Sequence, residues 1–536
     1  MRRLGVFVLF LSAFAAAAHA QCVAGTKGLQ PSVRELAVGN DGEFRYVADV
    51  RGGDAPYTYE WQGTVGSRDF TARERMTPIF QNYADRYAEL TVTDRNNCKA
   101  AVTIGHLVPK KCTLTQYATT GTTGALQALG LEIHWFGSGV SWRVELENRG
   151  LKGFSLGQVE IKRPGDVNYN TVLHGAGATE IFVPYHDGAA TNRRLWDMQN
   201  CGPFLGNPHP CMREIKPADV APVDATLLTL PGDSVPMLAA ECRDQGLAAF
   251  CKYLDPSGNT LGYSRRAKEV VIWAVYDTGN YDYVIQYGFR NDGRITFRLG
   301  ASGYNSPANP NIASTAGNPF TPHMHNVLWR VNTDLFGAKG DRAFQSSHFE
   351  PQPGLTATDS DSVFFGEGML AWDPLLFQTL TVEGGGVNRF GNPIAYEFVP
   401  ADRTGTSHHW GNNEQFTTRW DWWVTRNHPG EDGTGNSPPN NWGTVFTEPD
   451  NYLLKYVMND ATLTNGGPEA LNHLADLVVW YRSSAHHGPI DEDRQASDTI
   501  NTMTGLTLMH WQGFDMEPHN LFDYNPVLSF NGCYPN

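Results

Sequence analysis

The chain is built from short apolar runs separated by polar turns, and the stretch 270–300 shows this pattern most clearly. Residues 270–276 form a continuous apolar run, Asp277 to Asn280 are a short polar turn, and 283–300 alternates between apolar and polar positions. Such a pattern predicts a buried strand, a tight turn and a second strand. We expect Tyr281 to begin the second strand with its side chain turned inward.

Strand patterns of this kind dominate the chain from residue 112 onward. They occupy 131–136, 140–147, 155–162, 268–276, 283–289, 293–299, 327–333, 393–399, 420–426 and 475–482. The best helical pattern is Pro468 to Leu474, and loops rich in Gly, Asn and Pro at 302–320 and 429–442 are expected to lie over the surface or a partner subunit. The fold class predicted is all-β dominated, with one large antiparallel β-sandwich as its main domain.

Residues 21–108 carry short strand patterns of their own. Three segments separated by turn residues lie at 43–50, 56–61 and 88–94. Their spacing is typical of a small β-sandwich. The runs Pro-Tyr-Thr-Tyr-Glu-Trp and Leu-Thr-Val-Thr-Asp resemble a PKD-like, immunoglobulin-like module, which implies an adhesive or substrate-docking role, or a plain spacer. A linker at 106–111 would separate this module from a domain over 112–536.

Composition narrows the class of protein. With 536 residues the chain is too long for one ordinary domain, and its 14 Trp, 55 Gly and 32 Pro fit a large β-rich globular protein. The net charge of −15 argues against a nucleic-acid-binding surface.

Residues 1–20 have the pattern of a secretory signal: two arginines, an apolar stretch and the cleavage motif Ala-His-Ala. The apolar stretch is too short for a membrane span, and polar residues interrupt every later candidate. The mature chain is expected to start near Gln21 and to be secreted or periplasmic. Cys22 raises the alternative of a lipoprotein, but the expected Leu three positions earlier is missing.

Eight cysteines in an exported chain suggest disulfide bonds, although they allow 105 pairings. Two pairs are expected: Cys22 with Cys98, which bracket the first unit, and Cys242 with Cys251, which are close in sequence. No Cys-x-x-Cys motif occurs, so a thiol-ligated zinc is not expected.

Two histidine motifs lie downstream of Tyr281. The motif His-Met-His at 323–325 places two imidazoles two positions apart, so in a strand both face one side and can bind one metal ion. A His pair at 486–487 follows the apolar run 477–480.

Together with Asn-Tyr-Asp-Tyr at 280–283, this set resembles the copper amine oxidases, whose Asn-Tyr-Asp/Glu-Tyr motif provides the tyrosine that becomes topaquinone. Further segments are similar to that family in the same order and extend the resemblance over roughly 112–530; they are 141–150, 183–185, 423–426 and 520–526.

The resemblance implies copper bound by His323, His325 and His487. In the family the third His follows a Trp by about seven residues, and His487 stands seven after Trp480, which leaves His486 as the rival third ligand. A zinc site made of the same residues is the other alternative, but zinc has no redox chemistry and could not oxidise a tyrosine.

The resemblance also implies that Tyr281 is the topaquinone precursor, with Asn280 beside it. Asp197, twelve residues after Tyr185, would be the base that removes the proton α to the amine nitrogen. This assignment requires a small deletion after Tyr185, and Asp187 is the alternative base. Tyr185 would hydrogen-bond the quinone oxygen.

A second metal site is implied at Asn332, Asp334 and Asp476. Two carboxylates and an amide suit calcium or a similar hard cation. The family has an Asp where this chain has Asn332, which weakens the expectation. Solvated carboxylates at strand ends are the alternative.

The function implied is the oxidation of a primary amine by dioxygen, with water as co-reactant, to give an aldehyde, ammonia and hydrogen peroxide; the enzyme would be a homodimer. Two alternatives stay open: a non-catalytic adhesive relative on the same fold, and a zinc or mononuclear copper enzyme with Tyr281 unmodified. The sequence does not indicate which amine is used.

Overall fold

The computed structural model describes the residues in the following ranges: 29–38, 43–65, 68–78, 86–96, 99–105, 112–119, 128–135, 139–148, 154–184, 194–196, 212–221, 223, 225–254, 260–278, 281–303, 322–337, 340–348, 359–373, 378–405, 420–428, 468–471, 476–488, 490–493 and 507–527.

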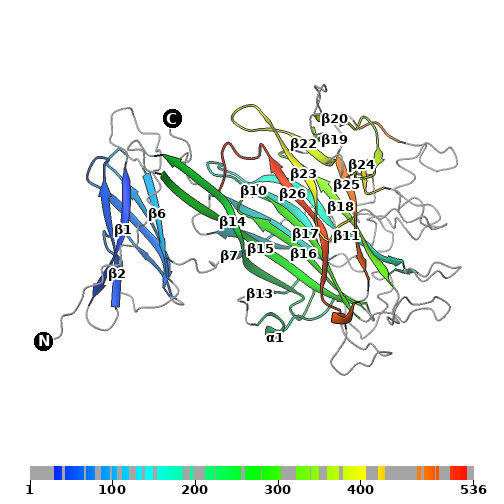
Figure 1. Cartoon of the computed structure of the whole chain (residues 1–536), viewed down its shortest axis with the longest axis horizontal. Coiled ribbons are helices and arrows are strands. Elements are labelled where there is room, and N and C mark those ends of the chain that lie inside the picture. The colour runs from blue at the N-terminus through cyan, green and yellow to red at the C-terminus, as the bar shows by residue number, and fades with distance from the viewer. Residues whose placement is uncertain are drawn as a thin grey trace.

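Two ten-stranded antiparallel sheets form the main body (Figure 1). Sheet 1 contains, in spatial order, β21 (Gly368–Leu370), β24 (Trp422–Arg426), β25 (Leu477–His487), β18 (His323–Thr333), β11 (Asn170–Pro184), β10 (Phe154–Lys162), β9 (Ser141–Asn148), β8 (Ala128–Trp135) and β7 (Cys112–Tyr117), with β12 (Arg194–Trp196) paired to β11. Sheet 2 contains β13 (Ala225–Leu228), β14 (Leu238–Leu254), β15 (Thr260–Asp277), β16 (Tyr281–Arg290), β17 (Ile295–Gly303), β26 (His510–His519), β23 (Pro393–Asp402), β22 (Thr379–Val387), β19 (Arg342–His348) and β20 (Asp359–Val363).

The two sheets share one hydrophobic core, because alternate positions of both turn toward each other. On β16 the inward residues Tyr283, Ile285, Tyr287 and Phe289 are all fully buried. They belong to the same cluster as Trp329 of β18 in the opposite sheet. Burial of each such side chain contributes roughly 1.5–3 kcal/mol to the free energy of folding, so this shared core holds the two sheets together. The predicted all-β sandwich is confirmed, and the strands predicted from residue 112 onward lie within or overlap those observed.

Strands near the N-terminus form a separate group (blue in Figure 1). It comprises the two-stranded sheet β1 (Gln30–Val38) and β2 (Glu43–Arg51), and the four-stranded sheet β4 (Arg68–Ala72), β3 (Thr58–Val65), β5 (Arg86–Thr93) and β6 (Lys99–Gly105). Trp61 lies at the centre of its core, which shares no residue with the core of the main body. The strands predicted at 43–50, 56–61 and 88–94 are present, whereas the immunoglobulin-like identity and the boundaries 21–108 and 112–536 stay predictions.

Helical segments are short in the described part of the chain, namely α1 (Pro217–Val220) and the 3-10 turn Asp491–Asp493. The helix predicted at Pro468 to Leu474 is wrong over its first four residues. Ala470 forms a β-bridge with Gly366, and Leu471 N–H donates to the carbonyl of Phe365. Pairing with a neighbouring segment overrides the weak helical pattern. None of the helices in the described ranges has the length and apolarity to cross a membrane.

One disulfide prediction is wrong. Cys242 is bonded to Cys112, with 5.7 Å between the two Cα atoms. Cys242 and Cys251 both lie on β14, and nine residues of extended strand span ~30 Å, so these two cannot meet. The observed bond joins β7 of sheet 1 to β14 of sheet 2. The predicted pair of Cys22 and Cys98 lies outside the described residues.

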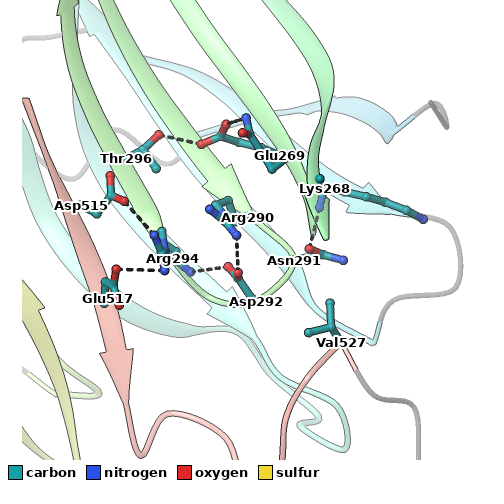
Figure 2. A network of polar contacts seen from close by, with 12 residues as sticks. Lys268, Glu269, Arg290, Asn291, Asp292, Arg294, Thr296, Asp515, Glu517 and Val527 are labelled. Carbon is teal, nitrogen blue, oxygen red and sulfur yellow. Dashed lines mark hydrogen bonds and ion pairs between the residues drawn. The ribbon is translucent and has the colours of Figure 1, made fainter. Parts of the chain in front are cut away.

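The outer face of sheet 2 carries a network of charged and polar side chains (Figure 2). Arg294 contacts both Asp515 and Glu517 at 2.9 Å, and Thr296 Oγ1 donates to Glu269 Oε1 at 2.6 Å. The outward polar residues therefore alternate with the inward aromatic ones, as the sequence pattern predicts.

Candidate metal and tyrosine centre

Tyr281 is the first residue of β16 and is 1 % exposed. The turn before it is closed by Thr278, whose backbone N–H and hydroxyl both donate to the carbonyl of Tyr281, at 2.9 and 2.8 Å. The strand start and the inward direction agree with the sequence prediction. Asn280 lies outside the described residues.

The three predicted copper ligands come from two paired strands of sheet 1. His323 and His325 open β18 on its inner side, and both are buried. In the register of β18 and β25, His323 stands opposite His487 and Met324 opposite His486. His487 is therefore turned inward and buried, whereas His486 is exposed.

Nitrogen atoms of the three imidazoles converge at one point. His323 Nε2 lies 3.1 Å from His325 Nε2 and 3.4 Å from His487 Nδ1. Nitrogens bound to one ion at about 2.0–2.1 Å, with angles between right and tetrahedral, are roughly 2.9–3.4 Å apart. The spacing thus fits a single metal ion. Tyr281 Oη borders that position, 3.0 Å from His323 Nε2 and 3.2 Å from His487 Nδ1.

Two of the histidine rings have a hydrogen-bond partner at the nitrogen that faces away from this point, which leaves the other ring nitrogen to face the metal position. Asp493 Oδ2 accepts from His487 Nε2 at 3.0 Å, so His487 Nδ1 carries the lone pair that faces His323. Tyr283 Oη lies 3.2 Å from His325 Nδ1, on the side of the ring away from Nε2. Neutral imidazole is the form that binds a metal.

Burial favours that neutral form. It holds the pKa of His325 well below its usual value, and the neighbouring imidazoles act in the same direction. Burial also lowers the pKa of His487, although the carboxylate of Asp493 opposes this effect.

Sequence reasoning missed several residues around the centre. Asp493, Tyr283 and His510 contact the histidine rings directly, and Gln512 donates to the carbonyl of His325 at 3.0 Å. Tyr283 and Asp493 could have been found, because they lie in the same local motifs as Tyr281 and His487. His510 and Gln512 come from β26, which no local spacing links to the histidines.

The predicted base and the tyrosine near it lie outside the described residues. Asp197 follows β12, and Tyr185 follows β11. β12 and β11 are paired at Trp196 and Phe182, and Phe182 pairs in turn with Asn326 of β18. The rival base Asp187 is likewise outside the described ranges.

The second predicted metal set lies at the other end of β18 and β25. Asn332 Oδ1 and Asp334 Oδ1 are buried with no hydrogen-bond partner in the described part of the chain, while Asp334 Oδ2 contacts His174 Nε2 at 2.9 Å. Asp341, which sequence reasoning missed, is also buried, and burial with the charges of Asp334 and Asp476 raises its pKa to about 7. Several buried oxygens with few donors form the kind of surroundings that a hard cation favours.

Known proteins share this architecture. A family model described as copper amine oxidase, enzyme domain, matches residues 130–533. A copper-containing amine oxidase, gamma 2, of Arabidopsis thaliana is 22% identical over 438 residues, covering 73% of this chain and 58% of that protein. A primary amine oxidase of Arthrobacter sp. (strain P1) is 24% identical over 429 residues, covering 73% of this chain and 59% of that protein.

The solved structure of a copper-containing benzylamine oxidase from Hansenula polymorpha superposes with a TM-score of 0.55 at 16% identity, covering 94% of this chain and 80% of that one. This likeness establishes the fold. The chain spans less than two thirds of the length of the two relatives above. Because the family model covers most of its residues, this protein belongs to the copper amine oxidase family.

Proposed function

We propose that this chain is a copper- and topaquinone-dependent oxidase of primary amines. Amine, dioxygen and water would give an aldehyde, ammonia and hydrogen peroxide. The observation that carries the proposal is the convergence of three buried imidazoles, two of which have a nitrogen within 3.2 Å of the hydroxyl of Tyr281. Membership of a family that uses copper and topaquinone, and relatives named as primary amine oxidases, support the class of reaction.

His323, His325 and His487 would hold copper, which imidazole suits well. When bound, copper would supply redox chemistry toward dioxygen, and the quinone derived from Tyr281 would supply an electrophilic carbonyl for the amine. The role of the protein would be to hold the tyrosine and the three histidines in this arrangement. The ring of Tyr281 packs against those of Tyr283 and His325, with centroids 6.1 and 4.6 Å away, and its burial limits access of water.

We assign the catalytic base to Asp197, which would take the proton from the carbon next to the amine nitrogen. The pairing of Trp196 with Phe182, and of Phe182 with Asn326, supports this assignment, because Trp196, the residue before Asp197, lies in the sheet that carries His325. Asp197→Asn should retain fold and metal, and turnover should fall by ~10²–10⁴-fold.

Asp187→Asn is the matched comparison for the base, and loss of turnover in that variant alone would move the role to Asp187. Tyr185, which follows the last residue of β11, would hydrogen-bond the quinone oxygen and hold its ring. Tyr185→Phe should therefore retain the cofactor but slow turnover.

The set Asn332, Asp334 and Asp476 would bind calcium or a similar hard cation. This proposal is supported by Asn332 Oδ1 and Asp334 Oδ1, which are buried and have no hydrogen-bond partner among the described residues. Export to a secreted or periplasmic location through residues 1–20, an immunoglobulin-like module over 21–108, and assembly as a homodimer are further proposals, which rest on the sequence pattern and the family resemblance.

The visible spectrum of protein purified with copper tests the proposal. We expect a quinone band that shifts with phenylhydrazine, and peroxide release with at least one member of a panel of primary amines. Tyr281→Phe should bind copper and lack the band, because phenylalanine has no phenol to oxidise. A colourless, copper-replete wild-type protein would refute the cofactor assignment and favour a zinc or mononuclear copper site.

A further inference from the structure

His510 lies directly against the third histidine of the metal centre but takes no part in the site proposed above. It opens β26, between β17 and β23, and is 6 % exposed. Its ring centroid is 4.2 Å from that of His487, with 44° between the ring planes. One face of the His487 ring is therefore covered by another flat ring.

Arg403 fixes the ring of His510. Arg403 follows the last residue of β23, and its Nη1 donates to His510 Nδ1 at 2.7 Å. A neutral imidazole that accepts at Nδ1 carries its proton on Nε2. His510 Nε2 has no hydrogen-bond partner within the described ranges.

This proton assignment bears on a second possible metal site. His487, Asp493 and His510 each offer a ligand atom within 4.8 Å of the other two. A protonated Nε2 has no lone pair for a metal, and the guanidinium of Arg403 beside Nδ1 would repel a cation there. The contact of His510 with His487 consequently fits a role in orientation better than one in ligation.

We propose that His510 is a positioning residue that holds the ring of His487 in the plane in which Nδ1 faces His323 and His325. The inference rests on the proposed copper site.

The physical reason lies in how an imidazole rotates. The torsion about the Cβ–Cγ bond of a histidine has broad minima, so the ring needs external restraint. His487 Nε2 lies closer to that rotation axis than Nδ1 does, so its hydrogen bond to Asp493 restrains a small twist less than a contact on the ring face does. A flat ring packed on one face blocks twist directly. Twist would carry Nδ1, which lies further from the axis, away from the metal position.

Copper affinity of the metal-free protein tests this inference without turnover. Apoprotein is titrated with copper(II) in the absence of dioxygen against a competing chelator, and the copper spectrum is recorded by electron paramagnetic resonance. His510→Ala should weaken copper binding by ~10–100-fold, the range found for residues behind metal ligands, and should change the copper hyperfine splitting. His510→Phe, which restores a flat ring, should recover most of the affinity and the wild-type spectrum.

His519→Ala is the matched control, because it removes an exposed imidazole from the other end of β26. It should bind copper like the wild type. The inference is overturned if folded His510→Ala matches the wild type in affinity and spectrum. It is also overturned if His510→Phe is as impaired as His510→Ala, or if the wild type binds a second metal that both His510 variants lose.

Thermal melting of each apoprotein reports whether the variant folds. If His510→Ala does not fold, the same measurements are made on Arg403→Gln. This variant removes the guanidinium that donates to His510 Nδ1 and keeps the His510 ring itself. A change in the copper spectrum of Arg403→Gln supports the inference, and a spectrum and affinity equal to wild type overturn it. Failure of the wild type to bind copper at His323, His325 and His487 would instead refute the proposed function.

Discussion

At the scale of single residues, the alternation of side chains along a strand decides which histidine reaches the metal position. His487 stands opposite His323 and is buried, while His486 stands opposite Met324 and is exposed. A shift of the pairing by one residue would exchange the two. The register is held by apolar residues that face the core, which follow the histidines on β18 and precede His487 on β25.

Substituting the two neighbouring histidines separately tests this register. His487→Ala should lose both copper and the quinone band, because a ligand is removed and cofactor formation requires the metal. His486→Ala should retain copper, because its side chain is directed to solvent. Copper content by atomic absorption and the visible spectrum provide the readout. Loss of copper in His486→Ala alone would show that the register is wrong by one.

Asp493 offers a second test at this scale. Its side chain is fully buried, and it accepts from both His487 Nε2 and the backbone N–H of Ile490, at 3.0 Å each. Asp493→Leu should weaken copper binding by ~10–100-fold, because His487 is then free to present the wrong nitrogen. Glu492→Gln, an exposed neighbour, is the control. Equal copper affinities in a chelator competition would argue against the role of Asp493.

Local motifs predict some of these residues and miss others for a physical reason. Tyr281 and the pair at 323–325 are visible in the sequence, because each occupies a recognisable strand pattern. His510 and Arg403 come from strands that meet the histidines only after both sheets have formed. No spacing along the chain encodes such a contact.

At the scale of elements, hydrophobic patterning predicts ten of the twenty strands of the two large sheets, and it does not predict which strands pair. The pattern does not predict β14, and the sequence alone suggested that Cys242 pairs with its near neighbour Cys251. An extended strand separates two of its own residues, so Cys242 bonds instead to Cys112 of β7. At 468–471, pairing with 365–366 prevails over a local helical pattern.

The outer face of sheet 2 supplies a prediction about pH. Glu269 of β15 is 4 % exposed, and burial raises its pKa although nearby arginines oppose this effect (Figure 2). A raised folded-state pKa gives stability that is present below the unfolded value of about 4.3 and lost as pH rises through the folded value. When the pKa values of the folded and unfolded states differ by one, the stability changes by about 1.4 kcal/mol.

Glu269→Gln should therefore gain free energy of unfolding relative to the wild type as pH rises from about 4 toward neutrality. The amide oxygen can still accept from Thr296 Oγ1, whereas the hydrogen bond from Gln245 Nε2 to the other carboxylate oxygen is lost at every pH and does not alter the pH trend. Melting temperatures of both proteins across this pH range provide the measurement. Glu214→Gln, at an exposed site, should leave the profile unchanged. Parallel profiles for Glu269→Gln and wild type would contradict the raised pKa.

At the scale of the whole molecule, the described strands fall into two groups with separate cores. Among the described strands, β1 to β6 pair only with one another, and their core shares no residue with that of the two large sheets. Burial lowers the pKa of Lys268 on β15, and the negative charge of Glu89 on β5 opposes this shift. The two groups of strands therefore interact through charge. The metal centre lies entirely on elements that belong to the large sheets or directly follow them.

Deletion of residues 21–108 should therefore leave a folded, copper-binding and active enzyme. The deletion removes no strand from either large sheet and spares Cys112, so the bond to Cys242 is kept.

Calorimetry of the full chain should show a separate unfolding transition for the N-terminal group, with an enthalpy of ~60 kcal/mol for a unit of this size, and the deletion should abolish it. Copper content and peroxide release with an amine complete the comparison. A soluble, copper-replete deletion variant without activity would show that the N-terminal group shapes the active site, and loss of solubility would show that the two cores depend on each other for stability.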